Sequence, residues 1–310
     1  MMYILRCFTY LLLVITVLSN KCAVNTEKKL DNSLSKPRWA IVALAKPGKS
    51  EIIKRNKLLA ENLRPYASNH NITVIMFSEK QFPASALSMW RKTFEGIATV
   101  QFIDTSSRGF NGPERYGYKY MCKFFSLDIY DYLRDNYDYY MRCDTDCYIT
   151  ELKYDILQWA EENHIGYAFG MRKLEAHKPT ISTLPTWSEE YINQCNIIPT
   201  SLMNEKFHTC FNFYNNFHLG RVSFFNRPDV RHYLEAVNNS GFILSHRWGD
   251  STIQAYAVRI FMENSDIYQI PNFKYIHGSH GNKIVSTINQ GEETNVPQKL
   301  PMWDNIKKNA

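Results

Sequence analysis

Residues Trp39–Ala45 read WAIVALA, a continuous apolar run about as long as one β-strand. A pattern typical of a helix follows it, with apolar residues at Ile52, Ile53, Leu58, Leu59 and Leu63. Two more short apolar runs come next, ITVIMF at residues 72–77 and VQFID at residues 100–104. Strands that are buried on both faces read as unbroken apolar runs, and strands that alternate with helices form a parallel sheet covered by helices. The chain is therefore expected to be an α/β protein.

The same alternation continues in the middle of the chain. Residues 118–135 have apolar side chains at helical spacing, and residues 137–143 (YDYYMRC) form a strand-like run. Residues 152–162 again fit a helix, and further helices are expected at residues 228–237 and 251–262. Between them the pattern loosens around Pro179, Pro185 and Pro199, which predicts irregular structure there.

Composition sets the size of the fold and excludes one class of partner. The chain has 310 residues, of which 45% are hydrophobic, so it can bury one large core. The formal net charge of +6 comes from scattered Lys and Arg residues and not from a run. No nucleic-acid-binding surface is predicted, since such surfaces concentrate their basic residues.

The first residues bear on the cellular compartment. An apolar stretch from Phe8 to Leu18 is followed by the polar residues SNKC. Its length suits the core of a signal peptide and is short for a bilayer crossing, which needs about 20 residues. A signal peptide and an uncleaved anchor both remain open, and both place the rest of the chain in the lumen of the secretory pathway, as a secreted or type II membrane protein. We predict a signal or anchor at 1–22, a stem at 23–37 and one domain at 38–310.

Cysteines leave the redox state open. Five of the seven fall in the predicted domain, at Cys122, Cys143, Cys147, Cys195 and Cys210. An odd number implies a free thiol or a pairing with Cys22, and the sequence does not select the connectivity. The spacing of Cys143 and Cys147 alone does not predict zinc, because no companion Cys or His motif stands nearby.

The triplet Asp144-Thr145-Asp146, directly after an apolar strand, is the sharpest functional signal. Two carboxylates one residue apart can reach one Mg²⁺ or Mn²⁺ ion, which takes its remaining ligands from phosphates and water. Sugar transfer from a nucleotide develops negative charge on the leaving pyrophosphate, and such an ion neutralises it. Ligands of open α/β sheets also bind at the carboxyl ends of the strands. A polar turn capped by an Asp fits the triplet equally well.

Other candidate positions each have a simpler structural explanation. Arg142 can bind phosphate or lie on the surface. Asp250 can cap the helix that follows it or act on a sugar hydroxyl. His277 can be a ligand of the same metal or a structural histidine. One aromatic group is expected to belong to the core and not to stack on a sugar: Phe211, Phe213, Tyr214 and Phe217.

Several segments resemble one known family when they are taken together and in order. They are YKYMCKFFS at 118–126, YYMRCDTD at 139–146, FHTCFNFYNNFHLG at 207–220, FFNRPDVRHYLEAV at 224–237, HRWGDSTIQAYAVRIF at 246–261 and YIHG at 275–278. The chain resembles glycosyltransferase family 15, the fungal Golgi and glycolipid alpha-1,2-mannosyltransferases. The resemblance covers about residues 116–282, with weaker support from Trp39 onward.

The resemblance implies both a fold and an activity. The fold is GT-A-like, with a mixed, mostly parallel central sheet flanked by helices. The activity is a retaining, Mn²⁺-dependent transfer of mannose from GDP-mannose to a hydroxyl of a glycan or glycoprotein, with alpha-1,2 linkage. By position, the metal ligands are Asp144, which replaces the family's Glu, with Asp146 and His277. The residues matched to the diphosphate are Tyr118, Arg142, Asp144 and Asp146, and those matched to the acceptor region are Asn216 and Asp250.

One departure bears on mechanism. His218 stands where the family has the Glu proposed as nucleophile or stabiliser of a retaining transfer. An imidazole cannot supply that carboxylate, so a double displacement through a catalytic His218 is in doubt. A front-side route, in which the departing phosphate steers the acceptor hydroxyl, tolerates the change. A different nucleotide sugar, or a relative that binds glycan or nucleotide without turnover, also fits.

Overall fold

A computed structural model describes residues 35–45, 50–105, 114–201, 206–278 and 283–287. The predicted signal or anchor at 1–22 and most of the predicted stem at 23–37 lie outside the described residues. Within the described ranges, no helix combines the length and the apolar character that a bilayer crossing requires.

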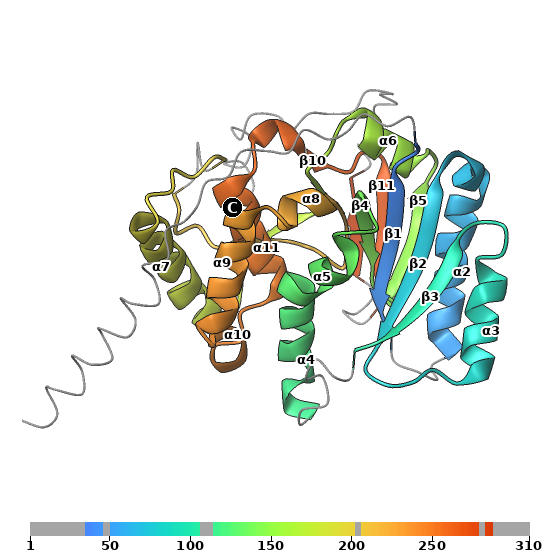
Figure 1. Cartoon of the computed structure of the whole chain (residues 1–310), viewed down its shortest axis with the longest axis horizontal. Helices are drawn as coiled ribbons and strands as arrows, with labels where there is room; N and C mark the ends of the chain where they lie inside the picture. Colours follow the sequence, from blue (N-terminus) through green and yellow to red (C-terminus); the bar gives the residue numbers. More distant parts are fainter. Residues whose placement is uncertain (1–34, 46–49, 106–113, 202–205, 279–282, 288–310) are drawn as a thin grey trace, which may run out of the picture.

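A mixed, mostly parallel sheet of seven strands forms the centre of the molecule (Figure 1). Its strands, in spatial order, are β10 (Ile267–Gln269), β6 (Tyr167–Phe169), β9 (Phe217–Arg221), β4 (Tyr139–Cys143), β1 (Arg38–Leu44), β2 (Asn71–Ser78) and β3 (Thr99–Asp104). Only β9 runs antiparallel to its neighbours β4 and β6. The predicted α/β class and the sheet that the resemblance implied are confirmed.

Helices cover both faces of this sheet, as Figure 1 shows. On one face lie α2 (Ser50–Leu63), α3 (Ala84–Thr93) and α6 (Ile156–Glu162). On the other face lie α4 (Glu114–Lys123), α5 (Ile129–Leu133), α7 (Lys178–Gln194), α8 (Val222–Phe225), α9 (Pro228–Asn239), α10 (Phe242–Ser245) and α11 (Asp250–Phe261). A π-helical segment, Phe124–Asp128, joins α4 to α5, and 3₁₀ turns span Arg64–Asn69 and Asn264–Asp266.

Two smaller sheets extend the carboxyl end of β4. A three-stranded antiparallel sheet consists of β12 (Lys283–Ser286), β11 (Phe273–His277) and β5 (Cys147–Leu152). A two-stranded sheet pairs β7 (Arg172–Leu174) with β8 (Phe211–Phe213). Because β5 starts only four residues after β4 ends, the chain turns sharply at Asp144–Asp146, and β11 pairs with β5 beside this turn.

Alternate residues of the buried strands build two separate cores. Trp39, Ile41 and Ala43 of β1 belong to the core under α2 and α3, whereas Ala40 and Val42 belong to the core on the other face. Side chains alternate between the two faces of a strand, so a strand buried on both faces must be apolar throughout. This requirement explains why β1 reads as an unbroken apolar run.

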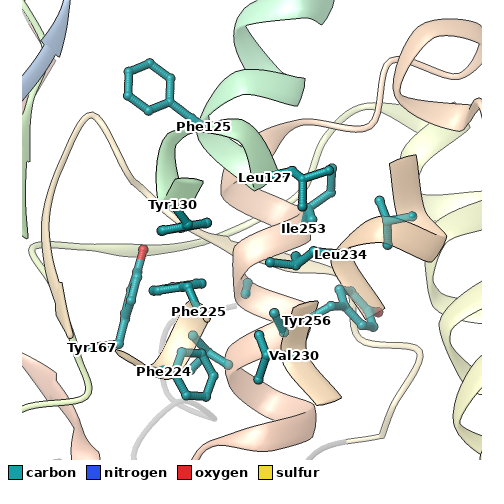
Figure 2. Packing of buried hydrophobic residues seen from close by; sticks show 14 of the residues in the cluster. Phe125, Leu127, Tyr130, Tyr167, Phe224, Phe225, Val230, Leu234, Ile253 and Tyr256 are labelled. Carbon is teal, nitrogen blue, oxygen red and sulfur yellow. The ribbon is translucent and has the colours of Figure 1, made fainter. Parts of the chain in front are cut away.

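The second core is dominated by aromatic side chains, and Figure 2 shows part of it. Its labelled members come from the segment after α4 (Phe125, Leu127, Tyr130), from β6 (Tyr167), and from α8, α9 and α11 (Phe224, Phe225, Val230, Leu234, Ile253, Tyr256). Tyr130 stacks on Phe225 with ring centroids 4.3 Å apart. This packing fixes α11 against the sheet, and α11 in turn carries Asp250.

The region around Pro179 and Pro185 forms a helix, so the prediction of irregular structure there is wrong. Helix α7 spans 17 residues, with Pro179 in its first turn and Pro185 in its interior. Proline in a helix interior removes a hydrogen bond and disfavours the helix by about 3 kcal/mol. Burial of Leu184, Ser188 and Tyr191 on one side of α7 outweighs that penalty.

A buried charged cluster joins α6 to the turn before β2. The imidazole of His70 lies 2.8 Å from a carboxylate oxygen of Asp155 and 3.2 Å from one of Glu161. The indole of Trp39 also donates to Glu161, at 2.7 Å. Burial disfavours the charged imidazole, but the two carboxylates outweigh it and raise the pKa of His70 above its ordinary value of 6.5.

This cluster predicts that stability depends on pH. A raised pKa in the folded state means that the folded chain holds the His70 proton more tightly than the unfolded chain. The stabilisation is complete below pH 6.5 and is lost as pH rises through the folded-state pKa. We expect the free energy of unfolding, measured in urea from pH 5.5 to 8.5, to fall with rising pH and to fall less steeply in His70→Asn. His208→Asn, at an exposed histidine 3.0 Å from Glu189, is the control; equal slopes in both variants and the wild type would contradict the assignment.

Candidate active site

The predicted acidic triplet forms the turn between β4 and β5. The backbone N–H of Cys147 donates to the carbonyl of Asp144 at 2.9 Å, and the N–H of Asp144 donates to the carbonyl of Asn216 at 2.9 Å. These bonds hold the turn against the start of β9. The triplet therefore forms a polar turn, and its two carboxylates point to different partners.

Asp144 points back to Arg142. The guanidinium of Arg142 donates from Nε and Nη2 to the two oxygens of Asp144, at 2.7 and 2.9 Å. Its Nη1 donates to Asp250 at 2.5 Å, and its Cζ lies 3.5 Å from the ring centre of Phe125. Burial alone would lower the pKa of Arg142, but the two carboxylates raise it, so the side chain stays charged. Arg142 is thus a buried cation that joins the end of β4 to α11, and its predicted contact with a diphosphate stays a prediction.

Asp250 is the first residue of α11, and the predicted capping role is wrong. The N-cap is Gly249, and no side chain caps this helix. The carboxylate of Asp250 is buried and accepts from Arg142 and from the amide of Asn215, the latter at 2.9 Å. A second contact links Asn215 to Gln254, one turn further along α11. Asn215 was not predicted as a site residue, although it precedes the predicted Asn216.

Asp146 points to His277 at the end of β11. Its Oδ2 lies 2.9 Å from Nε2 of His277, and the N–H of Gly278 donates to its backbone carbonyl. The other ring nitrogen of His277, Nδ1, forms a hydrogen bond with the hydroxyl of Tyr214. Folding therefore brings together two of the three predicted metal ligands, which are 131 positions apart in the chain. Folding also places Tyr214 beside these two residues, although the sequence predicts Tyr214 to belong to the core.

The chemistry of this pair suits a hard or borderline divalent ion. A carboxylate oxygen and an imidazole nitrogen are ligands that such an ion takes, and these two atoms can contact one cation once Nε2 of His277 releases the proton it shares with Asp146. Among the described residues, no group of three or more His, Cys, Asp and Glu side chains is placed to hold a metal. Asp144 does not complete such a group because both of its oxygens accept from Arg142, so its role as a ligand stays a prediction.

Asn216 lies in the turn before β9 and His218 lies in β9, and both side chains are buried. The amide oxygen of Asn216 accepts from the hydroxyl of Tyr275 at 2.7 Å, and its amide nitrogen contacts the sulfur of Cys147 at 3.2 Å. It therefore ties together β11, β5 and the acidic turn. This arrangement supports a positioning role for Asn216.

His218 has no exposed surface. Its Nδ1 donates to the carbonyl of Asn215 at 2.8 Å, so Nε2 accepts from the hydroxyl of Tyr140 at 3.0 Å. Its ring also stacks on Tyr167. Burial, reinforced by Arg142, lowers the pKa of His218 to about 3, which keeps the imidazole neutral. The predicted catalytic role of His218 gains no support from these surroundings.

Tyr118 lies on α4 and remains about half exposed, at 47%. Its hydroxyl lies against the backbone of Gly249, next to Asp250, and the guanidinium of Arg247 stacks on its ring at 4.5 Å. The structure thus places Tyr118 beside the Arg142–Asp250 pair.

The cysteines near this site are thiols. Cys122, Cys143, Cys147 and Cys210 are buried as free cysteines. Burial raises the pKa of Cys147 well above its ordinary value, so the thiolate that zinc requires is disfavoured.

The Arg142 pairing predicts a large effect on stability. Replacing Arg142 with Met leaves two carboxylates without their buried cation, and we expect the free energy of unfolding to fall by about 3 to 5 kcal/mol. The control is Arg227→Met, which removes a more exposed guanidinium from Asp229 and should cost less than about 1 kcal/mol. Urea denaturation compares the two variants. Similar losses would show that the Arg142 cluster is not what holds β4 to α11.

Comparisons with known proteins agree with this geometry. Residues 96–294, more than half of the chain, match the family model described as glycolipid 2-alpha-mannosyltransferase. A probable mannosyltransferase of Candida albicans is 28% identical over 214 residues, which cover 67% of this chain and 54% of the relative. A glycolipid 2-alpha-mannosyltransferase of Saccharomyces cerevisiae is 26% identical over 175 residues, covering 53% and 39%. The chain thus spans about half the length, or less, of these curated relatives.

Solved structures show the same fold at lower identity. Core-mannan synthase A from Aspergillus fumigatus, in its Mn/GDP form, superposes with a TM-score of 0.65 at 17% identity, covering 84% of this chain and 78% of that one. A mannosyltransferase from S. cerevisiae in complex with GDP gives 0.62 at 16% identity, with the same coverage. These likenesses support the fold, and the family-model match decides the membership. The chain belongs to the glycolipid 2-alpha-mannosyltransferase family.

Proposed function

We propose that this protein transfers a mannosyl group from GDP-mannose to a hydroxyl of a glycan or glycoprotein acceptor, with retention of configuration and alpha-1,2 linkage. The observation that carries the proposal is the Asp146–His277 pair, which lies where β4 ends in a chain of this family. The related synthase solved with manganese and GDP supports the choice of ion and nucleotide.

Asp146 and His277 would hold the divalent ion, and Asp144 is proposed as a further ligand from the same turn. When bound, such an ion neutralises the negative charge that develops on the departing diphosphate. The hydroxyl of Tyr214 orients His277 through Nδ1, which leaves Nε2 directed at Asp146. A partner on the second ring nitrogen is the usual arrangement for a metal-binding histidine because it fixes the tautomer.

The remaining site residues would position the donor and the acceptor. Tyr118 and the charged Arg142 cluster lie next to α11. We assign them to binding the diphosphate of the donor. Asp250, with Asn216 behind the acidic turn, is proposed to align the acceptor hydroxyl. Because Arg142 and Asn215 both donate to Asp250, its carboxylate is held in one orientation.

A front-side route is the mechanism that these residues favour. A double displacement needs a carboxylate nucleophile at the sugar, and His218 is a neutral, fully buried imidazole with both ring nitrogens bonded. In the front-side route the acceptor hydroxyl attacks on the face from which the diphosphate departs, and the diphosphate oxygen takes its proton. The protein then aligns two reactants and needs no covalent intermediate.

The proposed location is the lumen of the secretory pathway, including the Golgi. The apolar segment at residues 8–18, which lies outside the described residues, supports this proposal, as does the family. Contact with the membrane is proposed through that segment alone. No nucleic-acid partner is proposed, because the sequence contains no concentrated run of basic residues.

A donor screen tests the proposal. Purified protein with Mn²⁺ is incubated separately with GDP-mannose and with UDP-sugars in the presence of an alpha-mannoside acceptor. We expect GDP release and a product only from GDP-mannose. Asp146→Asn should weaken Mn²⁺-dependent GDP binding, measured by calorimetry, by about a hundredfold or more, since a direct ligand matters at least as much as the groups that support it.

Asp135→Asn is the matched control because this carboxylate is 79% exposed and remote from the acidic turn. It should bind GDP as the wild type does. Release of UDP would replace the proposed donor, and GDP binding without turnover would make the protein a nucleotide-binding relative. Full Mn²⁺-dependent binding by Asp146→Asn would remove Asp146 from the metal site.

The Tyr214–His277 contact makes a separate prediction. Tyr214→Phe keeps the ring and removes only the hydroxyl that orients His277. We expect Mn²⁺ affinity, measured by the paramagnetic relaxation of water protons, to fall by about tenfold. Tyr154→Phe is the control. It removes a hydroxyl that donates to the carbonyl of Pro271 and not to a metal ligand, so it should leave the Mn²⁺ affinity unchanged. Equal affinity in both variants would show that Tyr214 does not support the metal ligand.

A further inference from the structure

The charges of the site do not balance against a sugar nucleotide. Three carboxylates lie around the acidic turn: Asp144 and Asp250 pair with Arg142, and Asp146 pairs with His277. A divalent ion would neutralise these three carboxylates and Arg142 together, so the diphosphate needs further cations. Lys283 lies on the His277 side, 5.1 Å from the ring centre of Tyr214. Three of the five N–H groups of Arg142, on Nε, Nη1 and Nη2, already donate to Asp144 and Asp250, so a second cation is needed beside it.

A second guanidinium lies beside this group. Arg247 is exposed, and its guanidinium lies 4.5 Å from the ring centre of Tyr118. The hydroxyl of Tyr118 in turn lies against Gly249, one residue before Asp250. Arg247 therefore adjoins the residue already assigned to the diphosphate.

The backbone holds Arg247 in an unusual conformation. Its φ angle is +56°, in the left-handed region that residues with a Cβ seldom adopt. The following residue, Trp248, is fully buried against Trp187 and Phe242, and its indole donates to Thr183 at 2.8 Å. Trp248 is thus anchored in the core, and the exposed guanidinium of the preceding Arg247 lies over the ring of Tyr118.

We infer that Arg247 is a diphosphate-binding residue of the donor site and that it acts together with Tyr118. The inference rests on the proposed function and adds to it the cation that faces the nucleotide. A guanidinium matches two phosphate oxygens with paired N–H donors, and the Tyr118 ring keeps its plane in place. The pair would add affinity for the diphosphate to that of the Arg142 cluster.

Calorimetry with GDP and GMP in the presence of Mn²⁺ tests this assignment. The second phosphate is the difference between the two ligands, so a residue that binds the diphosphate must affect GDP more than GMP. We expect Arg247→Ala to weaken GDP binding by about tenfold or more and GMP binding by less than about threefold. Arg247→Lys should fall between the wild type and Arg247→Ala, because it keeps the charge and loses the planar fork.

Two further variants separate the side chain from the backbone and from general surface charge. Arg247→Gly removes the side chain and relieves the positive φ, so it should lose GDP affinity as Arg247→Ala does while keeping the fold. Arg91→Ala removes another guanidinium that lies over an aromatic ring, 5.7 Å from Phe102, and should bind GDP as the wild type does.

The outcomes distinguish the two levels of the proposal. If the wild type binds GDP and Arg247→Ala binds it equally well, the inference about Arg247 is wrong and the proposed function stands. Equal losses for GDP and GMP would place the effect away from the second phosphate and would also overturn the inference. If the wild type fails to bind GDP with Mn²⁺, the proposed function fails and the inference fails with it.

Discussion

A single buried cation sets the arrangement of the site. Arg142 at the end of β4 is 3% exposed, and a guanidinium at that depth is tolerated only if carboxylates compensate it. Asp144 from the turn and Asp250 from α11 supply them, and the ring of Phe125 covers the guanidinium plane. The π-helical segment brings Phe125 into that position and presents its carbonyl to Gln254 of α11. The charge of Arg142 thus fixes the central sheet, the acidic turn, the π-helical segment and α11 relative to one another.

The same pairing divides the acidic residues between two tasks. Asp144 and Asp250 are held by Arg142, and they stabilise the frame on which the donor would bind. Asp146, two residues further along the chain, does not contact Arg142. Its carboxylate contacts His277 of β11, the strand that pairs with β5. Because the turn also bonds to Asn216 and Gly278, both carboxylates keep their directions. The two acidic residues of one triplet therefore have different partners, Arg142 for Asp144 and His277 for Asp146.

The sequence predicts the frame better than the site. The buried stretches of β1 and β2 are almost wholly apolar because two cores need them, so these strands are visible in the sequence. Helix α7 is not predicted from the sequence because its prolines locally disfavour a helix. The burial that stabilises it depends on elements distant in the chain. Asp146 and His277 could be predicted from residue type and resemblance. Tyr214 and Asn215 could not be distinguished from core residues, since their contacts form only when the turn between β8 and β9 meets β11 and α11.

The histidine at position 218 and the orientation of Asp144 are two parts of one charge arrangement. His218 and Arg142 are direct partners across the antiparallel pair β4–β9, so their side chains lie on the same face of the sheet. A carboxylate at position 218 would compensate Arg142 from β9. A neutral imidazole leaves that charge to Asp144 and Asp250, and Asp144 turns inward to meet it. Both oxygens of Asp144 contact Arg142 in this arrangement, and the pair of Asp146 with His277 lies outside it.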